Sequence, residues 1–312
     1  MNKALKIAAI GECMIELRQG DAPAQFEMGY SGDSANSAIY LARAVRDLNH
    51  IQIDYISAVG SDPYSQQLVD FLKSESVGTS MIGRIPDRQA GLYIIRTDDH
   101  GERSFYYYRS QSAARVMFQG QAGQTLLAQL KAYDYLYFTG ISLSILDEAQ
   151  QQSLLSHLHD AKQAGAKLVF DGNYRPRGWQ DETHARLVFK QFLPLCDMAL
   201  MTFEDEQMLH GDEQPQQAID RLRRFGIQQG VIKLGRDGAI LFDSDSSQHI
   251  HPQTIIDRPV DTTAAGDSFN AAFLGALLSG QSPLEAVNAG NQLAAQVICH
   301  KGAIMPFFND DV

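Results

Sequence analysis

The segment Asp261-Thr262-Thr263-Ala264-Ala265-Gly266-Asp267-Ser268-Phe269 is the most informative part of this 312-residue chain. Its small residues end a loop, and the apolar run at 270–278 that follows predicts a buried helix. Backbone N–H groups at the start of a helix lack partners, and the helix dipole there favours an anion. Ala264, Ala265 and Gly266 therefore predict an anion site that a ligand can approach closely. Asp267 is either a reactive carboxylate at that site or a plain helix cap.

Outward from this segment, short apolar runs alternate with longer stretches of helical period, which predicts a mainly parallel sheet covered on both faces. The expected buried strands are residues 6–10, 54–59, 135–138, 167–170, 198–201 and 230–233. The helices expected between them are residues 34–48, 64–74, 147–164, 181–192 and 214–225. Near the end, antiparallel strands are expected at 231–234, 239–242 and 249–251, followed by helices at 267–279 and 283–299.

Two segments interrupt this alternation. Residues 14–30 are too long for an ordinary strand-to-helix loop. In residues 91–109, two strand-like runs flank the turn Asp98-Asp99-His100-Gly101, which predicts a hairpin. We expect these segments to form a small sheet, either a lid over a site or a decorated edge of the main sheet. Length alone implies about two domains, but the pattern predicts one core of residues 1–13, 31–90 and 110–312 with a lid of residues 14–30 and 91–109.

Composition limits the classes of function. The chain is 44% hydrophobic and 20% charged, and its 26 Lys and Arg residues against 37 Asp and Glu residues give a net charge of −11. This charge argues against a nucleic-acid partner and leaves room for a small anionic ligand held by a few basic groups. Cys13, Cys196 and Cys299 show no zinc or disulfide spacing, which indicates reduced thiols. No stretch approaches the roughly 18 apolar residues of a membrane span, so we expect no membrane contact and a cytoplasmic location.

The segment 261–269 closely resembles the C-terminal signature of the ribokinase-like (PfkB) carbohydrate kinases. The Gly-Gly-Asp-x-x-Asn segment of that family appears here as Ser31-Gly32-Asp33-Ser34-Ala35-Asn36, with Ser31 in place of the first glycine. The resemblance spans the chain and implies a ribokinase-like three-layer α/β/α core with a mainly parallel sheet plus a small β-sheet lid. It also implies that Asp267 is the catalytic base, accepting the proton of a substrate hydroxyl that attacks the γ-phosphate of ATP. The amides of Ala264, Ala265 and Gly266 would then hold the charge of the transferring phosphoryl group.

Nucleotide contacts are also implied by the resemblance. The loop from Lys233 to Gly238 lies beside the nucleotide in that family, although a simple hairpin explains its glycines equally well. The cofactor-binding residues implied are Asn173, Arg175, Lys233, Gly235, Asp237, Gly238, Ala264, Gly266 and Asn291.

Magnesium is expected with ATP because it neutralises and bridges the phosphates. The family's Asn-x-x-Glu segment corresponds to Thr202-Phe203-Glu204-Asp205, which makes Asp205 or the neighbouring Glu206 the candidate metal ligand. Some family members also bind a monovalent cation such as K⁺, for which Asp261 and Thr263 are the candidates.

Substrate choice is expected to depend on the hairpin. Strand alternation places Tyr107 and Arg109 on one face, beside Phe105 and opposite Tyr93 on the partner strand. The guanidinium fork of Arg109 matches a carboxylate, whereas a surface aromatic cluster is the alternative interpretation. Arg175 follows the carboxyl end of a predicted strand, where open α/β sheets bind ligands.

Gly101-Glu102-Arg103-Ser104-Phe105-Tyr106-Tyr107-Tyr108-Arg109, Asn173-Tyr174-Arg175-Pro176 and the opening Ile10-Gly11-Glu12-Cys13-Met14-Ile15-Glu16-Leu17 resemble the acid-sugar kinases of the family. This implies ATP-dependent phosphorylation of 2-dehydro-3-deoxy-D-gluconate at its 6-hydroxyl. The expected substrate contacts are Gly32, Asp33, Asn36, Tyr93, Tyr107, Arg109, Arg175 and Asp267.

The alternatives are a fructokinase or another neutral-sugar kinase, for which two arginines would be surplus, and a non-catalytic sugar- or nucleotide-binding regulator. The exposed edge and apolar face of the lid predict a homodimer formed through it.

Overall fold

A nine-stranded sheet forms the centre of the computed structural model, which describes residues 4–20, 22, 24–97 and 103–306. The strand order is β13-β12-β11-β10-β9-β8-β1-β4-β5. All neighbouring pairs from β11 to β5 are parallel, whereas β12 and β13 are antiparallel. The strands are β1 (Leu5–Ile10), β4 (Ile51–Val59), β5 (Ile82–Arg84), β8 (Tyr135–Thr139), β9 (Lys167–Asp171), β10 (Met198–Thr202), β11 (Gln229–Lys233), β12 (Ala239–Asp243) and β13 (Ser247–Ile250).

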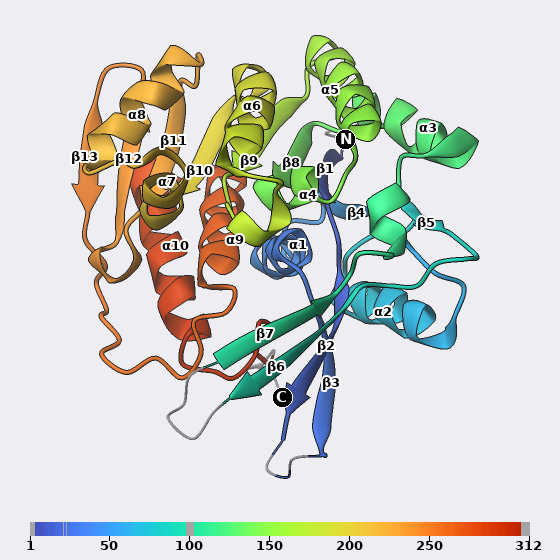
Figure 1. The fold of residues 1–312 in the computed structure, drawn as a ribbon. Helices are drawn as coiled ribbons and strands as arrows, with labels where there is room; N and C mark the ends of the chain where they lie inside the picture. The colour runs from blue at the N-terminus through green and yellow to red at the C-terminus, as the bar shows by residue number, and fades with distance from the viewer. Residues whose placement is uncertain (1–3, 21, 23, 98–102, 307–312) are drawn as a thin grey trace.

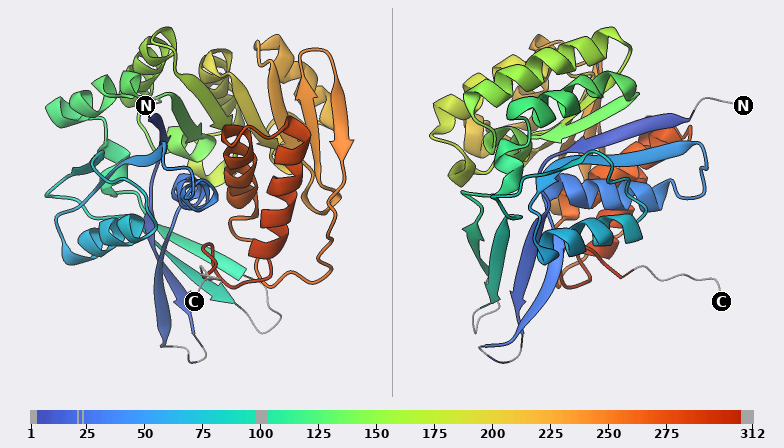
Figure 2. Two further views of the ribbon diagram at one scale, coloured as in Figure 1. Left: turned by 180° about the vertical axis from the view of Figure 1, so that it is seen from behind. Right: turned by 90° about the vertical axis from the view of Figure 1, so that its right-hand side faces the viewer.

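Helices cover both faces of this sheet (Figures 1 and 2). One hydrophobic cluster joins the sheet to α1 (Asp33–Ala44), α2 (Pro63–Ser74), α9 (Ala265–Leu278) and α10 (Pro283–Val297). A second cluster joins the opposite face to α3 (Gly120–Ala128), α4 (Gly140–Ser144), α5 (Glu148–Gln163), α6 (Glu182–Phe192), α7 (Phe203–His210) and α8 (Pro215–Arg224). The central strands are apolar on both faces because both faces are buried. The predicted three-layer α/β/α core is confirmed.

Element boundaries differ from the predictions where tertiary pairing adds to local pattern. The strand predicted at 54–59 begins at Ile51, because Ile51 and Ile53 pair with Leu5 and Ile7 of β1. The helix predicted at 34–48 ends at Ala44. The strand predicted at 249–251 lies at Ser247–Ile250, in antiparallel register with β12. The short helices α3, α4 and α7 were not predicted.

A separate four-stranded sheet has the order β3-β2-β6-β7 and contains β2 (Met14–Gln19), β3 (Phe26–Ser31), β6 (Leu92–Thr97) and β7 (Arg103–Tyr108). We call it the small sheet. It projects from the core beyond α1 and α2 (Figure 2). The alternative of a decorated edge of the main sheet is therefore wrong. The turn predicted at Asp98-Asp99-His100-Gly101, together with Glu102, lies outside the described residues.

The strand order fixes where a ligand can bind. β1 lies between β4 and β8, so the chain leaves β1 first toward one side of the sheet and later toward the other. Open α/β sheets bind ligands at the carboxyl ends of strands beside such a switch point. Thr139, Asp171, Thr202 and Lys233 end β8, β9, β10 and β11 at this edge. No helix among the described residues is long and apolar enough to cross a membrane.

Candidate active site

A cavity of about 740 Å³ lies between the inner face of the small sheet and the carboxyl edge of the main sheet. Some of the residues that line it were not singled out in the sequence as site residues, among them Met14, Ser104, Tyr106, Ile141 and Thr262. Most of the residues singled out in the sequence meet there. The residues of that set which line the cavity are Gly32, Asp33, Asn36, Tyr93, Tyr107, Arg109, Asn173, Arg175, Lys233, Thr263, Ala264, Ala265, Gly266 and Asp267.

Asp267 lies in the first turn of α9 but does not cap it. The N-cap residue is Ala264, which makes no side-chain cap hydrogen bond. The Asp267 carboxylate instead accepts a hydrogen bond of 2.8 Å from Asn36 Nδ2 on α1. The interpretation of Asp267 as a plain helix cap is therefore wrong. Burial, and then the nearby Asp33 carboxylate, raise the pKa of Asp267 to about 7, against the opposing effect of the Asn36 hydrogen bond.

Asn36 is itself held in one orientation. Its Oδ1 accepts hydrogen bonds from Ser31 Oγ at 3.2 Å and from Gly32 N at 3.3 Å, which leaves Nδ2 directed at Asp267. Ser31, at the position where the family pattern has glycine, thus adds a donor to this arrangement. Gly32 has no room for a side chain, since a Cβ there would lie 2.0 Å from the Glu12 carbonyl oxygen. The turn into α1 therefore brings Asn36 to the site.

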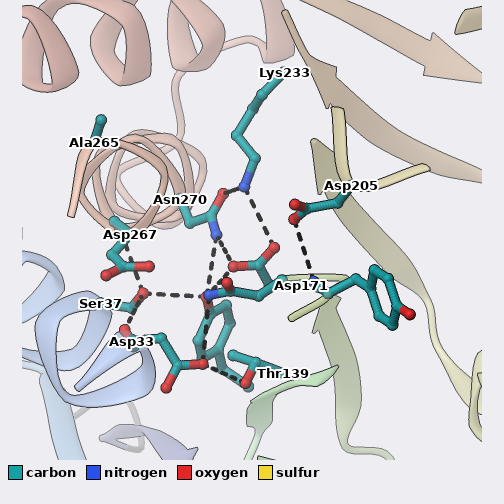
Figure 3. A network of polar contacts seen from close by, with 12 residues as sticks. Asp33, Ser37, Thr139, Asp171, Asp205, Lys233, Ala265, Asp267 and Asn270 are labelled. Carbon is teal, nitrogen blue, oxygen red and sulfur yellow. Dashed lines mark hydrogen bonds and ion pairs between the residues drawn. The ribbon is translucent and has the colours of Figure 1, made fainter. Parts of the chain in front are cut away.

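A buried polar network lies beside Asp267 (Figure 3). Lys233 Nζ donates to Asn270 Oδ1 at 2.9 Å and lies 3.4 Å from Asp171 Oδ1. Asn270 Nδ2 donates to the other Asp171 oxygen at 2.9 Å and to the Tyr137 hydroxyl at 3.1 Å. Ser37 Oγ donates to the same hydroxyl at 3.1 Å. The network connects β8, β9, β11 and α9. It also places the Lys233 ammonium group near the carboxylates of Asp171 and Asp267.

A second set of polar contacts surrounds Asp33, the first residue of α1. Its carboxylate accepts hydrogen bonds from Thr139 Oγ1 and, at 3.4 Å, from Asn173 Nδ2. Burial raises the pKa of Asp33, and the Thr139 hydrogen bond acts in the opposite direction. Asn173 has a left-handed backbone with φ 32°, and its Oδ1 is buried with no hydrogen-bond partner among the described residues. A strained residue with an unused acceptor at a cavity wall is typical of a binding site.

The loop before α9 is shaped for close approach of an anion. Ala264 adopts the left-handed conformation, with φ 62°. The Asp261 carboxylate accepts hydrogen bonds from Thr263 N at 2.8 Å and Gly302 N at 2.9 Å, which fixes the start of the loop. Ala265 N donates a long bond of 3.3 Å to the Thr262 carbonyl oxygen.

Gly266 leaves the cavity open at the start of α9. A Cβ built on Gly266 would meet only Lys233 Nζ, at 3.6 Å, among the described atoms within 4 Å. An anion bound at Gly266 would therefore lie next to the Lys233 ammonium group. The helix dipole of α9 and the charge of Lys233 would both stabilise an anion bound at Gly266.

The two candidate magnesium ligands, Asp205 and Glu206, do not line the cavity. Asp205 accepts hydrogen bonds from Arg175 Nη1 at 2.9 Å and from Tyr174 N at 3.2 Å, and burial raises its pKa to about 6. Glu206 is buried against Arg221, 2.6 Å from Nη2. Both carboxylates thus have structural partners. Among the described residues no three His, Cys, Asp or Glu side chains gather as a preformed metal site.

Four further candidates do not line the cavity: Gly235, Asp237, Gly238 and Asn291. Gly235 and Gly238 have φ angles of 60° and 89°, and Leu234 N donates to the Gly238 carbonyl oxygen at 2.8 Å. Turn geometry therefore accounts for both glycines. The side-chain nitrogen of Asn291 on α10 is buried and has no hydrogen-bond partner among the described residues.

The small sheet contributes an aromatic wall. Tyr93 and Tyr107 pair across β6 and β7, with ring centroids 5.6 Å apart, and Phe105 packs beside both rings. The Tyr93 hydroxyl donates to Glu16 Oε2. Arg109 follows the end of β7 and lines the cavity from the same side. Arg175 and Arg177 line it from the loop after β9.

Sequence reasoning missed several residues of the site. Asp171, Tyr137, Asn270, Ser37 and Thr139 form the network behind Asp267 and Asp33. Asp171 and Thr139 were detectable, because each is the last residue of a buried strand at the ligand-binding edge. Nothing in the local pattern separates Tyr137, Ser37 or Asn270 from ordinary core residues of a strand or helix.

Comparison with known proteins agrees with the resemblance seen in the sequence. The family model "pfkB family carbohydrate kinase" matches residues 4–309. A 2-dehydro-3-deoxygluconokinase of Haemophilus influenzae is 41% identical over 302 residues, covering 96% of this chain and 95% of the relative. One of Escherichia coli is 38% identical over 303 residues, covering 96% and 97%. The crystal structure of a putative ribokinase II from E. coli with ATP and Mg²⁺ superposes with a TM-score of 0.81 at 21% identity, covering 96% of this chain and 94% of the other.

Proposed function

Because the chain belongs to the pfkB family of carbohydrate kinases, we propose that it transfers the γ-phosphoryl group of ATP to the 6-hydroxyl of 2-dehydro-3-deoxy-D-gluconate. The observation that carries this proposal is the position of Asp267. Its buried carboxylate lies at the open start of α9 in a cavity that also presents two arginines from opposite sides. The names of the two relatives above support the same substrate.

Asp267 acts as the general base. A carboxylate with a pKa of about 7 is ionised in part at neutral pH and is basic enough to accept a hydroxyl proton as the oxygen attacks phosphorus. The hydrogen bond from Asn36 holds Oδ2, so the other oxygen, Oδ1, is our candidate for the atom that accepts the proton. The bond from the hydroxyl oxygen to the γ-phosphorus forms while the bond to the β-phosphate oxygen breaks, and the proton moves to Asp267.

Phosphoryl transfer depends mainly on positioning and on charge stabilisation. The amides of Ala265 and Gly266 and the Lys233 ammonium group surround the place where that charge is held. Asp171 and Asn270 hold the lysine side chain, which is only 8% exposed. Its charge is therefore fixed in advance of the reaction.

The donor set also fits Mg²⁺ bound with ATP. Magnesium keeps several waters and takes one or two carboxylates plus phosphate oxygens, so it requires no closed protein cage. Besides Asp267, the carboxylates at the cavity wall are Asp33 and Asp171, and Asn173, whose Oδ1 has no hydrogen-bond partner among the described residues, lines the same cavity. When bound, the ion neutralises phosphate charge. The Asp261 and Thr263 loop remains our candidate for a monovalent cation.

An acid sugar fits the cavity better than a neutral one. Arg109 and Arg175 enter it from the small sheet and from the loop after β9. A carboxylate takes paired hydrogen bonds from a guanidinium group, whereas a neutral hexose gives an arginine no charge to neutralise. The aromatic wall of Tyr93 and Tyr107 packs against the carbon chain. A fructokinase remains the second candidate, because phosphoryl transfer at this site does not require the substrate to carry a carboxylate.

The proposal includes a role for the small sheet as a lid and as the contact of a homodimer. Phe26, Met28 and Tyr108 on this sheet do not line the cavity and are 42%, 46% and 64% exposed. An apolar sheet face of this kind is suited to burial against a second copy of the chain.

ADP release with 2-dehydro-3-deoxy-D-gluconate, fructose and ribose, each with and without Mg²⁺, tests the proposed function. We expect turnover of the acid sugar that requires Mg²⁺. Preference for fructose would make the chain a neutral-sugar kinase, and binding of ATP and sugar without turnover would make it a regulator.

A further inference from the structure

Glu12 and Arg109 form a buried ion pair beside the cavity. Glu12 follows β1, its side chain is 1% exposed, and its Oε2 contacts Arg109 Nη2. The Arg109 side chain is 19% exposed and lines the cavity, whereas Glu12 lies behind it. Neither carboxylate oxygen of Glu12, nor Nε or Nη2 of Arg109, has a hydrogen-bond partner among the described residues. The two charges are therefore paired with each other, and these atoms have no further hydrogen-bond partner in the described part of the chain.

This arrangement is unexpected for a purely structural pair. A buried carboxylate is destabilising unless its charge is paired and its oxygens are hydrogen-bonded. The charge of Glu12 is paired with Arg109, but its oxygens have no further hydrogen bond among the described residues. A buried guanidinium with unused donors at a cavity wall points to a missing acceptor on a ligand. An anion bound in the cavity would give the Arg109 guanidinium group such an acceptor.

Gly91 makes room for the pair. A Cβ at Gly91 would lie 2.5 Å from Glu12 Oε1 and 3.2 Å from Arg109 Cβ. Gly91 also accepts a backbone hydrogen bond of 2.8 Å from Ile15 N, at the root of the small sheet. The side chains of Glu12 and Arg109 therefore meet where the small sheet joins the core.

We propose that Glu12 is a positioning residue for Arg109, and that through this contact it determines the preference for an acid sugar. The inference rests on the proposed function. Arg109 has a long, flexible side chain, and a fixed anion behind it holds the guanidinium group facing the cavity. Glu12 contacts Nη2, and the Arg109 side chain, which is 19% exposed, still lines the cavity in which the substrate carboxylate would bind. Glu12 itself touches no substrate.

A Glu12 that competes with the substrate for Arg109 and a Glu12 that positions Arg109 predict opposite changes in KM. If Glu12 competed with the substrate for Arg109, removing its charge would lower KM for the acid sugar. If Glu12 positions Arg109, removing the charge raises KM. The isosteric substitution Glu12→Gln separates the two, because it keeps the side-chain volume while it removes the charge.

The test measures kcat and KM with 2-dehydro-3-deoxy-D-gluconate for the wild type, Glu12→Gln and Gly91→Ala. We expect both variants to raise KM for the acid sugar about tenfold or more with kcat changed less than about threefold. KM for ATP stays at the wild-type value. Gly91→Ala displaces the Glu12 carboxylate without removing its charge, so it carries the test if Glu12→Gln fails to fold. The matched control is Glu27→Gln. Glu27 also forms an ion pair with an arginine, Arg18, on the small sheet, but its side chain is 65% exposed.

A double-mutant cycle with Arg109→Gln adds a readout that a general structural effect would not move. If Glu12 acts through Arg109, adding Glu12→Gln to Arg109→Gln changes KM by less than about twofold. Equal effects of Glu12→Gln with and without Arg109, an unchanged KM in a folded variant, or a lowered KM would each overturn the inference. If the wild type does not phosphorylate the acid sugar, the proposed function fails and the inference fails with it. If the wild type does and the variants keep its KM, only the inference fails.

Discussion

Asn36 and Asp267 are 231 positions apart in the chain, and a hydrogen bond of 2.8 Å joins Asn36 Nδ2 to Asp267 Oδ2. The bond connects the first turns of α1 and α9, the two helices that begin at the cavity. It stabilises the ionised form of a carboxylate that burial would otherwise keep protonated. The orientation of the proposed base, Asp267, and its protonation therefore depend on the same contact.

Asn36→Ala is expected to raise the pKa of Asp267 above its present value of about 7, because the hydrogen bond that lowers this pKa is lost. A smaller fraction of the base is then ionised at pH 7, and kcat/KM falls there but recovers as the pH rises. The measurement is kcat/KM between pH 5.5 and 9.5 (roughly the range over which a shifted carboxylate titrates). Gln66→Ala, an exposed change on α2, is the control. An unshifted profile would contradict the role of this bond.

Asp171→Asn is expected to shift the profile in the other direction. For the wild type we expect the acid limb of kcat/KM to have its midpoint at about 7, since this quantity reports the free enzyme. The Asp171 carboxylate raises the pKa of Asp267, and Lys233 lowers it. Removing the Asp171 charge also frees Lys233 from its partner, so both changes lower the midpoint. A midpoint that rises or stays would show that Asp171 does not act on the base through charge.

Asp267→Asn is expected to stabilise the folded protein at high pH. The folded carboxyl group has a pKa of about 7 against an ordinary value of 3.8, so its contribution to stability is present below pH 3.8 and is lost as the pH rises through about 7. The amide is neutral throughout. Tm of the variant should exceed that of the wild type at pH 8, and the difference should shrink as the pH falls to 5. A variant that is less stable than the wild type at pH 8 would contradict this account.

Leu158→Ala tests the packing of α5 on the sheet, independently of the site. Leu158 is fully buried in the cluster that holds α5 against the main sheet. The change should lower the free energy of unfolding by about 2–5 kcal/mol. KM and kcat of the folded fraction should stay at wild-type values, because α5 does not line the cavity. A large change in KM would mean that this helix layer is coupled to the site.

The fold could be predicted largely because its strands are buried on both faces. Runs such as Leu168, Val169 and Phe170 are apolar without interruption, which is typical of a central parallel strand. Strand boundaries that depend on pairing with another strand were harder to predict from the sequence. The start of β4 at Ile51 is set by pairing of Ile51 and Ile53 with Leu5 and Ile7 of β1.

The site was predictable where residues act through backbone or through a recognisable segment. The loop 261–267 and Asn36 lie in the two recognisable segments of the sequence, and they meet at the cavity. The supporting network was not predictable, because Tyr137 and Asn270 each look like core residues until the sheet and α9 bring them together. The pairing of Arg109 with Glu12 likewise joins positions that only the small sheet makes neighbours.

The most direct test of the account is the turnover of Asp267→Asn with 2-dehydro-3-deoxy-D-gluconate and ATP, measured beside the binding of both ligands. Asparagine keeps the shape of the side chain and cannot accept the proton. We predict that kcat falls roughly 10²-fold or more while the dissociation constants of sugar and ATP change by less than about threefold. Turnover close to that of the wild type would contradict the assignment of Asp267 as the base.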